Sequence, residues 1–552
     1  MTARIPASES LTVEFKSDRQ KLPDRVLMET VVGMANAQGG SIYLGVEDDG
    51  RVTGLHADHH NVSGLAAFIA NRTSPPVDVH VELLRSDGLP VARIDVSRAT
   101  QLTATTDGIV RRRRLKPDGT PETVPFLPHE FASRQSDLGL LDFTARPVAE
   151  AGLDDLDPLE RARLRQLVEQ YGGDAKLLDL EDDALDGALC LTTRRGDRRV
   201  PTILGLLLIG RVSALRTHLP THEVAFQVLD GEEIRFNEFW RSPLLKTFEL
   251  IETHFNPHNP EQEVQAGLFR VPVPKVDRRA FREAVCNALT HRDFTRRGAV
   301  HIRLEAEGLT VSNPGGLVDG VTLENLLITE PRPRNPVLAD AFKRIGLVER
   351  TGRGVDLIYR GLLRYGRNLP DYSRTDMHSV VVRMSTSDAD LAFLSLVLEE
   401  ENARQRPLPI NALIALSAFR SQRRLNRSEL ARFIQKSEVG AGRVLEALVE
   451  HGLIQPHDDG RGRTYTLSPR IYRSLGQPAE YTRQAGFDTM QQEQMVINFV
   501  RQHGEIRRKD VMELCQLSQD QAYRLLRRLT AEGILQAVGK KKASFYTLGI
   551  DE

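Results

Sequence analysis

The chain has 552 residues, of which 40% are hydrophobic and 27% charged, and its 74 Lys and Arg residues balance its 75 Asp and Glu residues. This length exceeds what one hydrophobic core supports, so we expect several domains. The balanced charge excludes a chain-wide basic field, so any nucleic-acid surface must be local. The cysteines Cys190, Cys286 and Cys515 lack the spacing of a zinc site or a disulfide scaffold. Because no signal-peptide core or membrane-length apolar run is present, we expect a cytoplasmic protein without a membrane partner.

The first segment has the pattern of a small α/β domain. Leu11–Lys16 alternates apolar and polar residues, as a half-buried strand does. A helix is predicted to begin at Pro23-Asp24 and to end at Gly39-Gly40, where glycine allows a left-handed exit. A buried strand is predicted at residues 41–46. The segment contains no Walker loop.

Three stretches of this segment, ESLTVEFK, ANAQGGSIYLGVEDDGRVTGL and GIVRRRR, resemble the Schlafen AlbA-type domain. In Schlafen nucleases, a Glu-x4-Glu pair and a downstream Asp form a metal-dependent RNA-cutting site. The resemblance implies such a site at Glu9, Glu14 and either Asp48 or Asp49, with Lys16 beside it. Clustered carboxylates can hold Mg²⁺ or Mn²⁺ and activate water for attack on a phosphodiester. The alternatives are a binding module that keeps these acids, or a solvated ion pair beside an ordinary turn.

The densest basic run of the chain is predicted to lie on a late strand of the same segment and consists of Arg111, Arg112, Arg113 and Arg114. Alternate side chains of a strand point to opposite faces, so at most half of the run can line one groove. We interpret the run as a phosphate contact, because arginine forks match phosphate oxygens. The alternative is a solubilising edge strand.

The segment at 136–275 shows no spacing typical of a catalytic site. Residues 156–171 are predicted to be helical, and 201–210 (PTILGLLLIG) are predicted to form a buried strand. Residues 222–229 and 232–239 are predicted as further strands or a hairpin. We expect a connector domain, which resembles the middle region of RecG-like AlbA proteins.

A helix predicted at residues 279–293 has an apolar stripe and a polar face. Glu283, Asn287 and His291 recur every four residues, so each is turned about 40° from the last and all three line one face. An aligned acid, amide and imidazole can supply a water-activating base and a metal-binding amide. The alternative is a solvated face on an ordinary amphipathic helix.

Two glycine-containing stretches follow, VSNPGG at 311–316 and TGRG at 351–354. Glycine at a helix N-terminus lets backbone N–H groups approach phosphate oxygens. Together with NALTHRDF and PRNPVLADAFKRIGLVERTGRGV, these stretches resemble the N, G1 and G2 boxes of a GHKL-type (Bergerat) ATP-binding fold, in the variant found in RecG-like AlbA proteins.

This second resemblance implies specific roles in a nucleotide site. Glu283 would be the general base of an ATPase and Asn287 the Mg²⁺ ligand. The further nucleotide-binding candidates are His291, Asn313, Gly315, Gly352 and Gly354. The G1 box of the family has an Asp that reads the adenine amino group, where this chain has the uncharged Asn313. The alternative is a GHKL scaffold that binds nothing, and a helicase is not implied because no Walker A or motor motif is present.

The C-terminal region contains an internal repeat, in which RVLEALVEHGLI at 443–454 matches RLLRRLTAEGIL at 524–535 with an offset of 81 residues. Each copy is predicted to have a helix (428–435 or 508–515), a second helix and a β-hairpin with a basic tip. This order is typical of a winged helix, which binds DNA or, alternatively, docks a protein. The candidate nucleic-acid contacts are Arg461, Arg463, Gln521, Arg524, Arg527, Arg528, Lys540, Lys541 and Lys542.

These patterns predict an α/β multidomain architecture. Its parts are a Schlafen AlbA-like nucleic-acid-binding domain (1–135), a connector (136–275), a GHKL-like ATP-binding α/β sandwich (276–390) and two winged-helix domains (391–475 and 476–552). The predicted function is ATP-responsive DNA binding, as a transcriptional regulator, with ATP and Mg²⁺ as cofactors and duplex DNA as partner. The alternatives are a Schlafen-like metal-dependent endonuclease acting on RNA, tRNA or DNA, and a non-enzymatic adaptor. Weak ATPase activity, RNA binding and homo-oligomerisation stay open.

Overall fold

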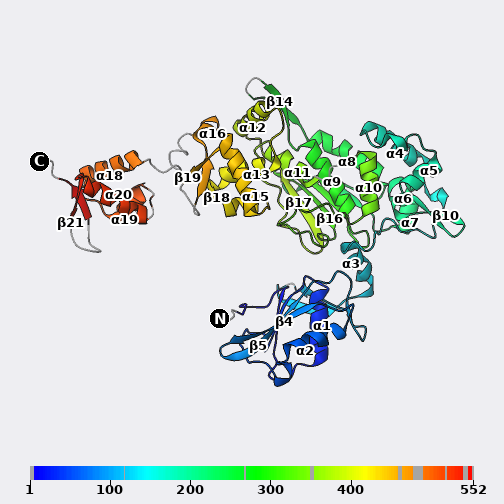
Figure 1. Cartoon of the computed structure of the whole chain (residues 1–552). Coiled ribbons are helices and arrows are strands. Elements are labelled where there is room, and N and C mark those ends of the chain that lie inside the picture. The colour runs from blue at the N-terminus through cyan, green and yellow to red at the C-terminus, as the bar shows by residue number, and fades with distance from the viewer. Residues whose placement is uncertain are drawn as a thin grey trace.

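The computed structural model is a mixed α/β chain of several domains, and it describes residues 5–116, 118–266, 269–348, 354–457, 463–475, 489–515, 517, 519–538 and 545–549. The N-terminal domain is joined through helix α3 (Phe131–Asp137) to a long central body, and the last helices lie at one end of the molecule (Figure 1). The predicted residues Gly352, Arg461, Lys540, Lys541 and Lys542 lie outside the described ranges. Within those ranges, every helix is too short or too polar to cross a membrane.

The N-terminal domain is built on a four-stranded sheet in the order β1-β2-β5-β4. Strand β1 (Val13–Lys16) runs parallel to β2 (Gly40–Leu44), and the other neighbours, β5 (Leu89–Val96) and β4 (Val79–Ser86), are antiparallel. Helix α1 (Asp24–Ala35) buries one face against this sheet. The predicted strand–helix–strand order of this segment is therefore present. The remaining regular elements here are α2 (Val62–Asn71), β3 (Thr73–Ser74), β6 (Ala104–Thr105), β7 (Arg111–Leu115) and β8 (Pro121–Pro125).

The central body contains a five-stranded sheet in the order β12-β11-β15-β16-β17. Its strands are β11 (Val224–Asp230), β12 (Glu233–Trp240), β15 (Val300–Leu304), β16 (Gly308–Pro314) and β17 (Ser379–Ser385). Strands β11 and β12 form the hairpin predicted for the connector, and β11 continues into the later sheet by pairing parallel to β15. One hydrophobic cluster runs from Leu156 to Met384. The predicted boundary at residue 275 therefore falls inside a single core.

Five helices share one hydrophobic core with the central sheet. They are α4 (Pro158–Gln170), α8 (Leu244–Phe255), α9 (Arg278–His291), α10 (Pro336–Ile345) and α11 (Gly354–Leu363). The smaller elements are α5 (Asp182–Ala188), β9 (Thr192–Arg195), β10 (Arg198–Pro201), α7 (Val212–His218) and the hairpin of β13 (Glu261–Ala266) and β14 (Phe269–Pro274).

The strand predicted at 201–210 is wrong, because these residues form helix α6 (Ile203–Ile209). Thr202 caps the helix by accepting a hydrogen bond from the Gly205 N–H at 3.0 Å. All seven residues of α6 are buried. A helix buried on every side has no polar face, so its sequence carries no helical periodicity to distinguish it from a buried strand.

Both copies of the C-terminal repeat contain the predicted helices and the following strand pair. The first copy comprises α12 (Leu391–Arg404), α13 (Ile410–Gln422), β18 (Arg424–Asn426), α14 (Arg427–Phe433), α15 (Glu438–Glu450), β19 (Ile454–His457), β20 (Thr464–Leu467) and α16 (Pro469–Ser474). The second comprises α18 (Thr489–His503), α19 (Arg508–Cys515), α20 (Gln519–Ala531), β21 (Leu535–Val538) and β22 (Phe545–Leu548). The first copy shares its core with Tyr359 and Leu363 of α11, whereas the second has a core of its own.

Candidate nucleotide cavity and nucleic-acid surfaces

A cavity of about 710 Å³ opens between α9, the end of β16, the segment 316–335, α10 and the start of α11. Among its lining residues are five that the sequence singled out: Glu283, Asn287, His291, Asn313 and Gly354. The structure therefore brings the polar face of α9 together with residues of both glycine-containing stretches. Tyr372 also lines this cavity, and no sequence motif had pointed to it.

Helix α9 presents its polar face to the cavity because its apolar face is buried in the central core. Asp277 caps the helix, and its carboxylate accepts hydrogen bonds from the Arg279 and Ala280 N–H groups, both at 2.9 Å. Phe281 and Val285 on the opposite side are buried. The predicted polar face is thus turned toward a cavity and away from bulk solvent.

The carboxylate of Glu283 lies against the first residue of α11. A Cβ at Gly354 would collide with Oε1 of Glu283 and would lie only 2.6 Å from its Cδ, so a side chain at this position needs Glu283 to move. A helix N-terminus carries partial positive charge, which stabilises a neighbouring carboxylate. Burial, with Tyr359 and Glu283 nearby, raises the pKa of the Tyr372 phenol, which therefore stays protonated.

The amide of Asn313 is held in one orientation at the end of β16. Its Nδ2 donates to the carbonyl of Pro314 at 3.2 Å and, more weakly, to that of His291 at 3.5 Å. Within the described part of the chain its Oδ1 has no partner. Asn313 therefore keeps an available hydrogen-bond acceptor at a position that lines the cavity.

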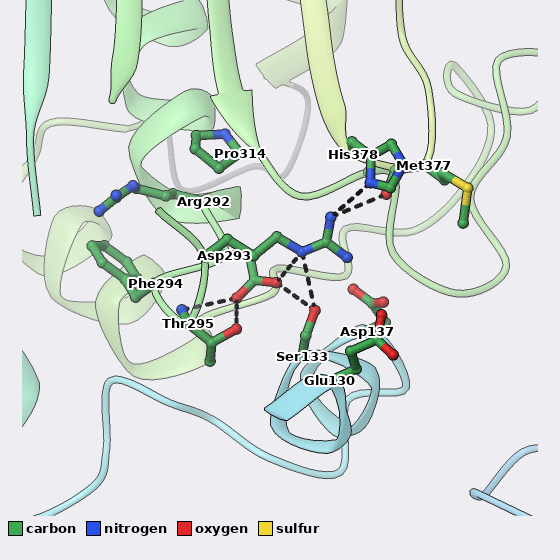
Figure 2. Close-up of polar contacts among 12 residues, drawn as sticks. Glu130, Ser133, Asp137, Arg292, Asp293, Phe294, Thr295, Pro314, Met377 and His378 are labelled. Atoms are coloured by element: carbon green, nitrogen blue, oxygen red, sulfur yellow. Dashed lines mark hydrogen bonds and ion pairs between the residues drawn. The ribbon is translucent and has the colours of Figure 1, made fainter. Parts of the chain in front are cut away.

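Asp293, just after α9, joins the cavity region to helix α3 (Figure 2). Its carboxylate accepts hydrogen bonds from the hydroxyls of Ser133, at 2.5 Å, and Thr295, at 2.6 Å, and pairs with Arg296 at 3.1 Å. Burial alone would raise the pKa of Asp293, but these hydroxyl donors and the nearby Arg334 guanidinium hold it below its usual range. The segment leaving the N-terminal domain is therefore fixed to the end of α9.

Gly315 packs closely against Asp293 and Arg334 and is not among the residues that line the cavity. It has φ +96°, and a Cβ there would lie 2.8 Å from Cβ of Asp293 and 3.3 Å from Cζ of Arg334. The predicted nucleotide-loop position is thus a packing glycine, whereas Gly316 lines the cavity. Arg334, which belongs to the stretch PRNPV but has no role predicted from the sequence, is 1% exposed and donates to the carbonyls of His291 and Gly316, both at 2.9 Å.

Glu9 and Glu14 of the N-terminal domain are near neighbours. Glu9 Oε1 accepts a hydrogen bond from the Phe15 N–H at 2.8 Å, and burial, with Glu14 nearby, raises the pKa of Glu9. Glu14 is 6% exposed and forms ion pairs with Lys16 and Arg113. Lys16 is therefore beside the acids as predicted, but the charge of Glu14 is already neutralised within the domain.

Asp48 and Asp49 belong to an exposed turn, where Asp49 Oδ1 accepts a hydrogen bond from the Arg51 N–H at 3.0 Å. Across the described residues, no group of three or more His, Cys, Asp or Glu side chains is placed to hold a metal ion. The predicted convergence of these aspartates with Glu9 and Glu14 on one metal is therefore not found. The sequence predicts the turn itself, but it does not show where the two aspartates lie relative to Glu9 and Glu14.

Each side chain of the arginine run is paired within the chain. The ion pairs are Arg111–Glu29, Arg112–Glu130, Arg113–Glu14 and Arg114–Glu122. Arg113 is 2% exposed and also donates to the carbonyls of Ser10 and Val13, both at 2.8 Å. The predicted phosphate contact is wrong for Arg113, because a buried guanidinium saturated by protein acceptors cannot meet a phosphate.

Helix α20 of the second copy has an exposed face that carries Gln521, Tyr523, Arg524 and Arg527. Arg528 instead pairs with Glu493 of α18. Arg463 of the first copy is exposed at the start of β20. Three of the four predicted contacts on α20 therefore share one outward face, and the fourth is engaged in packing two helices.

Comparisons with known proteins agree with this architecture. Residues 9–116 match the family model described as Schlafen, AlbA_2, and residues 298–384 match the model described as ATP-dependent DNA helicase recG C-terminal. The crystal structure of the DIP2311 protein from Corynebacterium diphtheriae has a similar fold, with a TM-score of 0.51 and 24% identity over 98% of this chain and 95% of that chain. No curated protein matches the chain.

Both resemblances are thereby confirmed: the chain contains a Schlafen AlbA_2 domain and a recG C-terminal, ATPase-like domain. Together these domains indicate a nucleic-acid-associated, ATP-binding protein. The second match begins after α9 (Arg278–His291), so the placement of Glu283, Asn287 and His291 at the cavity rests on the geometry described above.

Proposed function

We propose that this chain is an ATP-responsive, duplex-DNA-binding protein that acts as a transcriptional regulator. The observation that carries the proposal is the cavity in which Glu283, Asn287 and Asn313 come together. It lies in the body that also holds the first C-terminal repeat, since Tyr359 and Leu363 of α11 belong to the core of that repeat. A nucleotide bound in the cavity can therefore affect the position of the nucleic-acid-binding domains.

The cavity residues suit an adenine nucleotide with Mg²⁺. Oδ1 of Asn313 is an acceptor for the exocyclic amino group of adenine, which guanine lacks at that position. Asn287 would hold Mg²⁺, an ion that proteins commonly bind through one or two oxygen ligands while the nucleotide phosphates supply others. The metal would neutralise phosphate charge in a cavity whose lining also includes the acids Glu283 and Asp356. Glu283, against the N-terminus of α11, is the group placed to orient or deprotonate water.

Two features support DNA binding by the C-terminal repeats. Each copy has the helix–helix–hairpin order of a winged helix, in which the second helix enters the major groove. The exposed face of α20 adds Arg524 and Arg527, which can contact phosphates or guanine edges, and Gln521, which can contact adenine.

A thermal-shift series tests the nucleotide part of the proposal. ATP with Mg²⁺ should raise the melting temperature of the wild type, because a ligand that binds only the folded state stabilises it. Asn287→Ala should lose the Mg²⁺-dependent part of the rise, and Asn313→Leu should lose the preference for ATP over GTP. Gln422→Ala, an exposed amide on α13, is the matched control and should behave as the wild type. No shift with millimolar ATP in the wild type would contradict the proposal.

A further inference from the structure

The segment 316–335, here called the cavity loop, connects β16 to α10 and contains no helix or strand. It contributes Val318, Val321, Leu326 and Leu327 to the cavity lining. The other walls are the helices α9, α10 and α11 and the edge of the central sheet. Because irregular segments open at lower free energy than packed helices and strands, the cavity loop is the wall that a ligand can most readily displace.

The N-terminal domain and helix α3 contact the beginning of the cavity loop. Asp319 forms an ion pair with Arg98 of the N-terminal domain and lies 4.0 Å from Arg134 of α3. Its backbone N–H donates to the carbonyl of Asp137 at 3.0 Å. Asp137 in turn pairs with Arg334 at the end of the same loop.

The first C-terminal repeat holds the middle of the loop through one side chain. Oε1 of Gln435 accepts a hydrogen bond from the Leu327 N–H at 2.8 Å, and its Nε2 donates to the carbonyl of Leu323 at 2.7 Å. Gln435 lies in the turn between α14 and α15 and has φ +54°, an uncommon conformation for a residue with a side chain. Both polar ends of one amide therefore bind the backbone of a cavity wall, 108 residues away in sequence.

We propose that the cavity loop is a two-ended strap, by which nucleotide in the cavity changes both the helix–turn–helix of the first repeat, through Gln435, and the seating of the N-terminal domain, through Asp319. The inference rests on the proposed function and deepens it by naming the regulatory contacts. Coupling of this kind is reciprocal: if nucleotide changes the state of the repeat, restraint of the repeat changes nucleotide affinity by the same factor.

Hydrogen–deuterium exchange of the full chain, with and without ATP and Mg²⁺, tests the strap. In the nucleotide-free wild type, the Leu327 amide should be protected by Gln435. Gln435→Ala should speed its exchange about fivefold, as loss of a hydrogen bond of ordinary strength implies. Gln435→Glu keeps the acceptor for Leu327 and loses the donor to Leu323, so it should retain most of that protection. Gln422→Ala, on the same repeat, should leave exchange unchanged.

ATP should alter exchange in peptides covering 322–330 and 427–440 of the wild type. In Gln435→Ala, only the first of these changes should persist. A wild type that binds ATP, by thermal shift, yet shows no change at 427–440 would overturn the strap and leave the proposed function standing. A wild type that binds no ATP would overturn both. A Gln435→Ala variant that still transmits the change to 427–440 would also exclude Gln435 as the link.

Discussion

The two copies of the C-terminal repeat have the same order of helices and strands, but their second helices present opposite charge. The exposed positions of α15 include Glu438, Glu446 and Glu450 against one arginine, Arg443. The exposed positions of α20 instead carry arginines, glutamines and Tyr523, with both Arg524 and Arg527 outward. Because phosphate contact dominates affinity for DNA, α20 is suited to the groove and α15 is not.

The copies also differ in what surrounds them. The first is built into the central body through the core it shares with α11, and through the hydrogen bonds of Gln435 to the cavity loop. The second is held together by its own hydrophobic cluster. The comparison teaches that one sequence pattern can stand in two different surroundings. Under the proposed function, the first copy would receive a signal from the cavity and the second would contact DNA.

Charge reversal on α20 should have the largest effect. Arg524→Glu with Arg527→Glu is expected to abolish measurable binding to duplex DNA at moderate salt, because it replaces two attractive phosphate contacts with repulsion. The milder double change to Ala should lower the slope of log affinity against log salt by about 1.8, at ~0.9 per phosphate contact. Fluorescence anisotropy across a salt series measures both. Arg443→Glu on α15 is the matched control, and an equal loss there would erase the distinction between the copies.

Gly354→Ala should destabilise the central body by roughly 3 kcal/mol, near the upper end for overpacking, because the new methyl group meets Glu283. The only tryptophan of the chain, Trp240, lies in β12 of this body, so urea unfolding followed by its fluorescence reports the change. The second repeat should keep its own stability, as judged by exchange protection of α20. Gly187→Ala, in α5 at a position where an added Cβ would meet open space, should instead be neutral or slightly stabilising.

Acid should weaken the central body before it weakens the second repeat. Burial, with Arg292 and Arg241 nearby, lowers the pKa of His222 to about 4, whereas an unfolded histidine titrates near ~6.5. Stability that is present above pH ~6.5 is therefore lost as the pH falls toward 4, by up to roughly 3 kcal/mol. His222→Gln should flatten this dependence in urea titrations followed by Trp240. If the stability of His222→Gln depends on pH as steeply as that of the wild type, other titrating groups cause the dependence.

The smallest effect is expected from adding positive charge to the first repeat. Glu446→Lys with Glu450→Lys should raise DNA affinity only modestly and only at low salt, since exposed charges are screened. Stability should change by less than about 0.5 kcal/mol, as is usual for exposed positions. A gain that matches the contribution of α20 would mean that charge alone separates the two copies, whereas a small gain would show that their surroundings matter as well.

Much of the local structure follows from the sequence. The N-terminal strand–helix–strand order, the helix at α9 and both repeat copies were predictable, because hydrophobic period, caps and glycine exits act within a few residues. The polar face formed by Glu283, Asn287 and His291 depends only on helical geometry, and the structure indeed turns all three into one cavity.

Only the tertiary structure decided which partners these local elements have. Strand β11 pairs with β15, where Val224 lies beside Val300, 76 residues later in the chain. Helix α6 is buried on every side, so its sequence shows no helical periodicity. Four consecutive arginines look like a phosphate site until Glu29, Glu130, Glu14 and Glu122 are seen to neutralise them. Tyr372 and Gln435 lie outside the quoted motifs, and Arg334 lies inside one without an assigned role, since the roles of all three come from contacts across long stretches of chain. Hydrogen bonds and ion pairs depend on distance in space, and a sequence gives only distance along the chain.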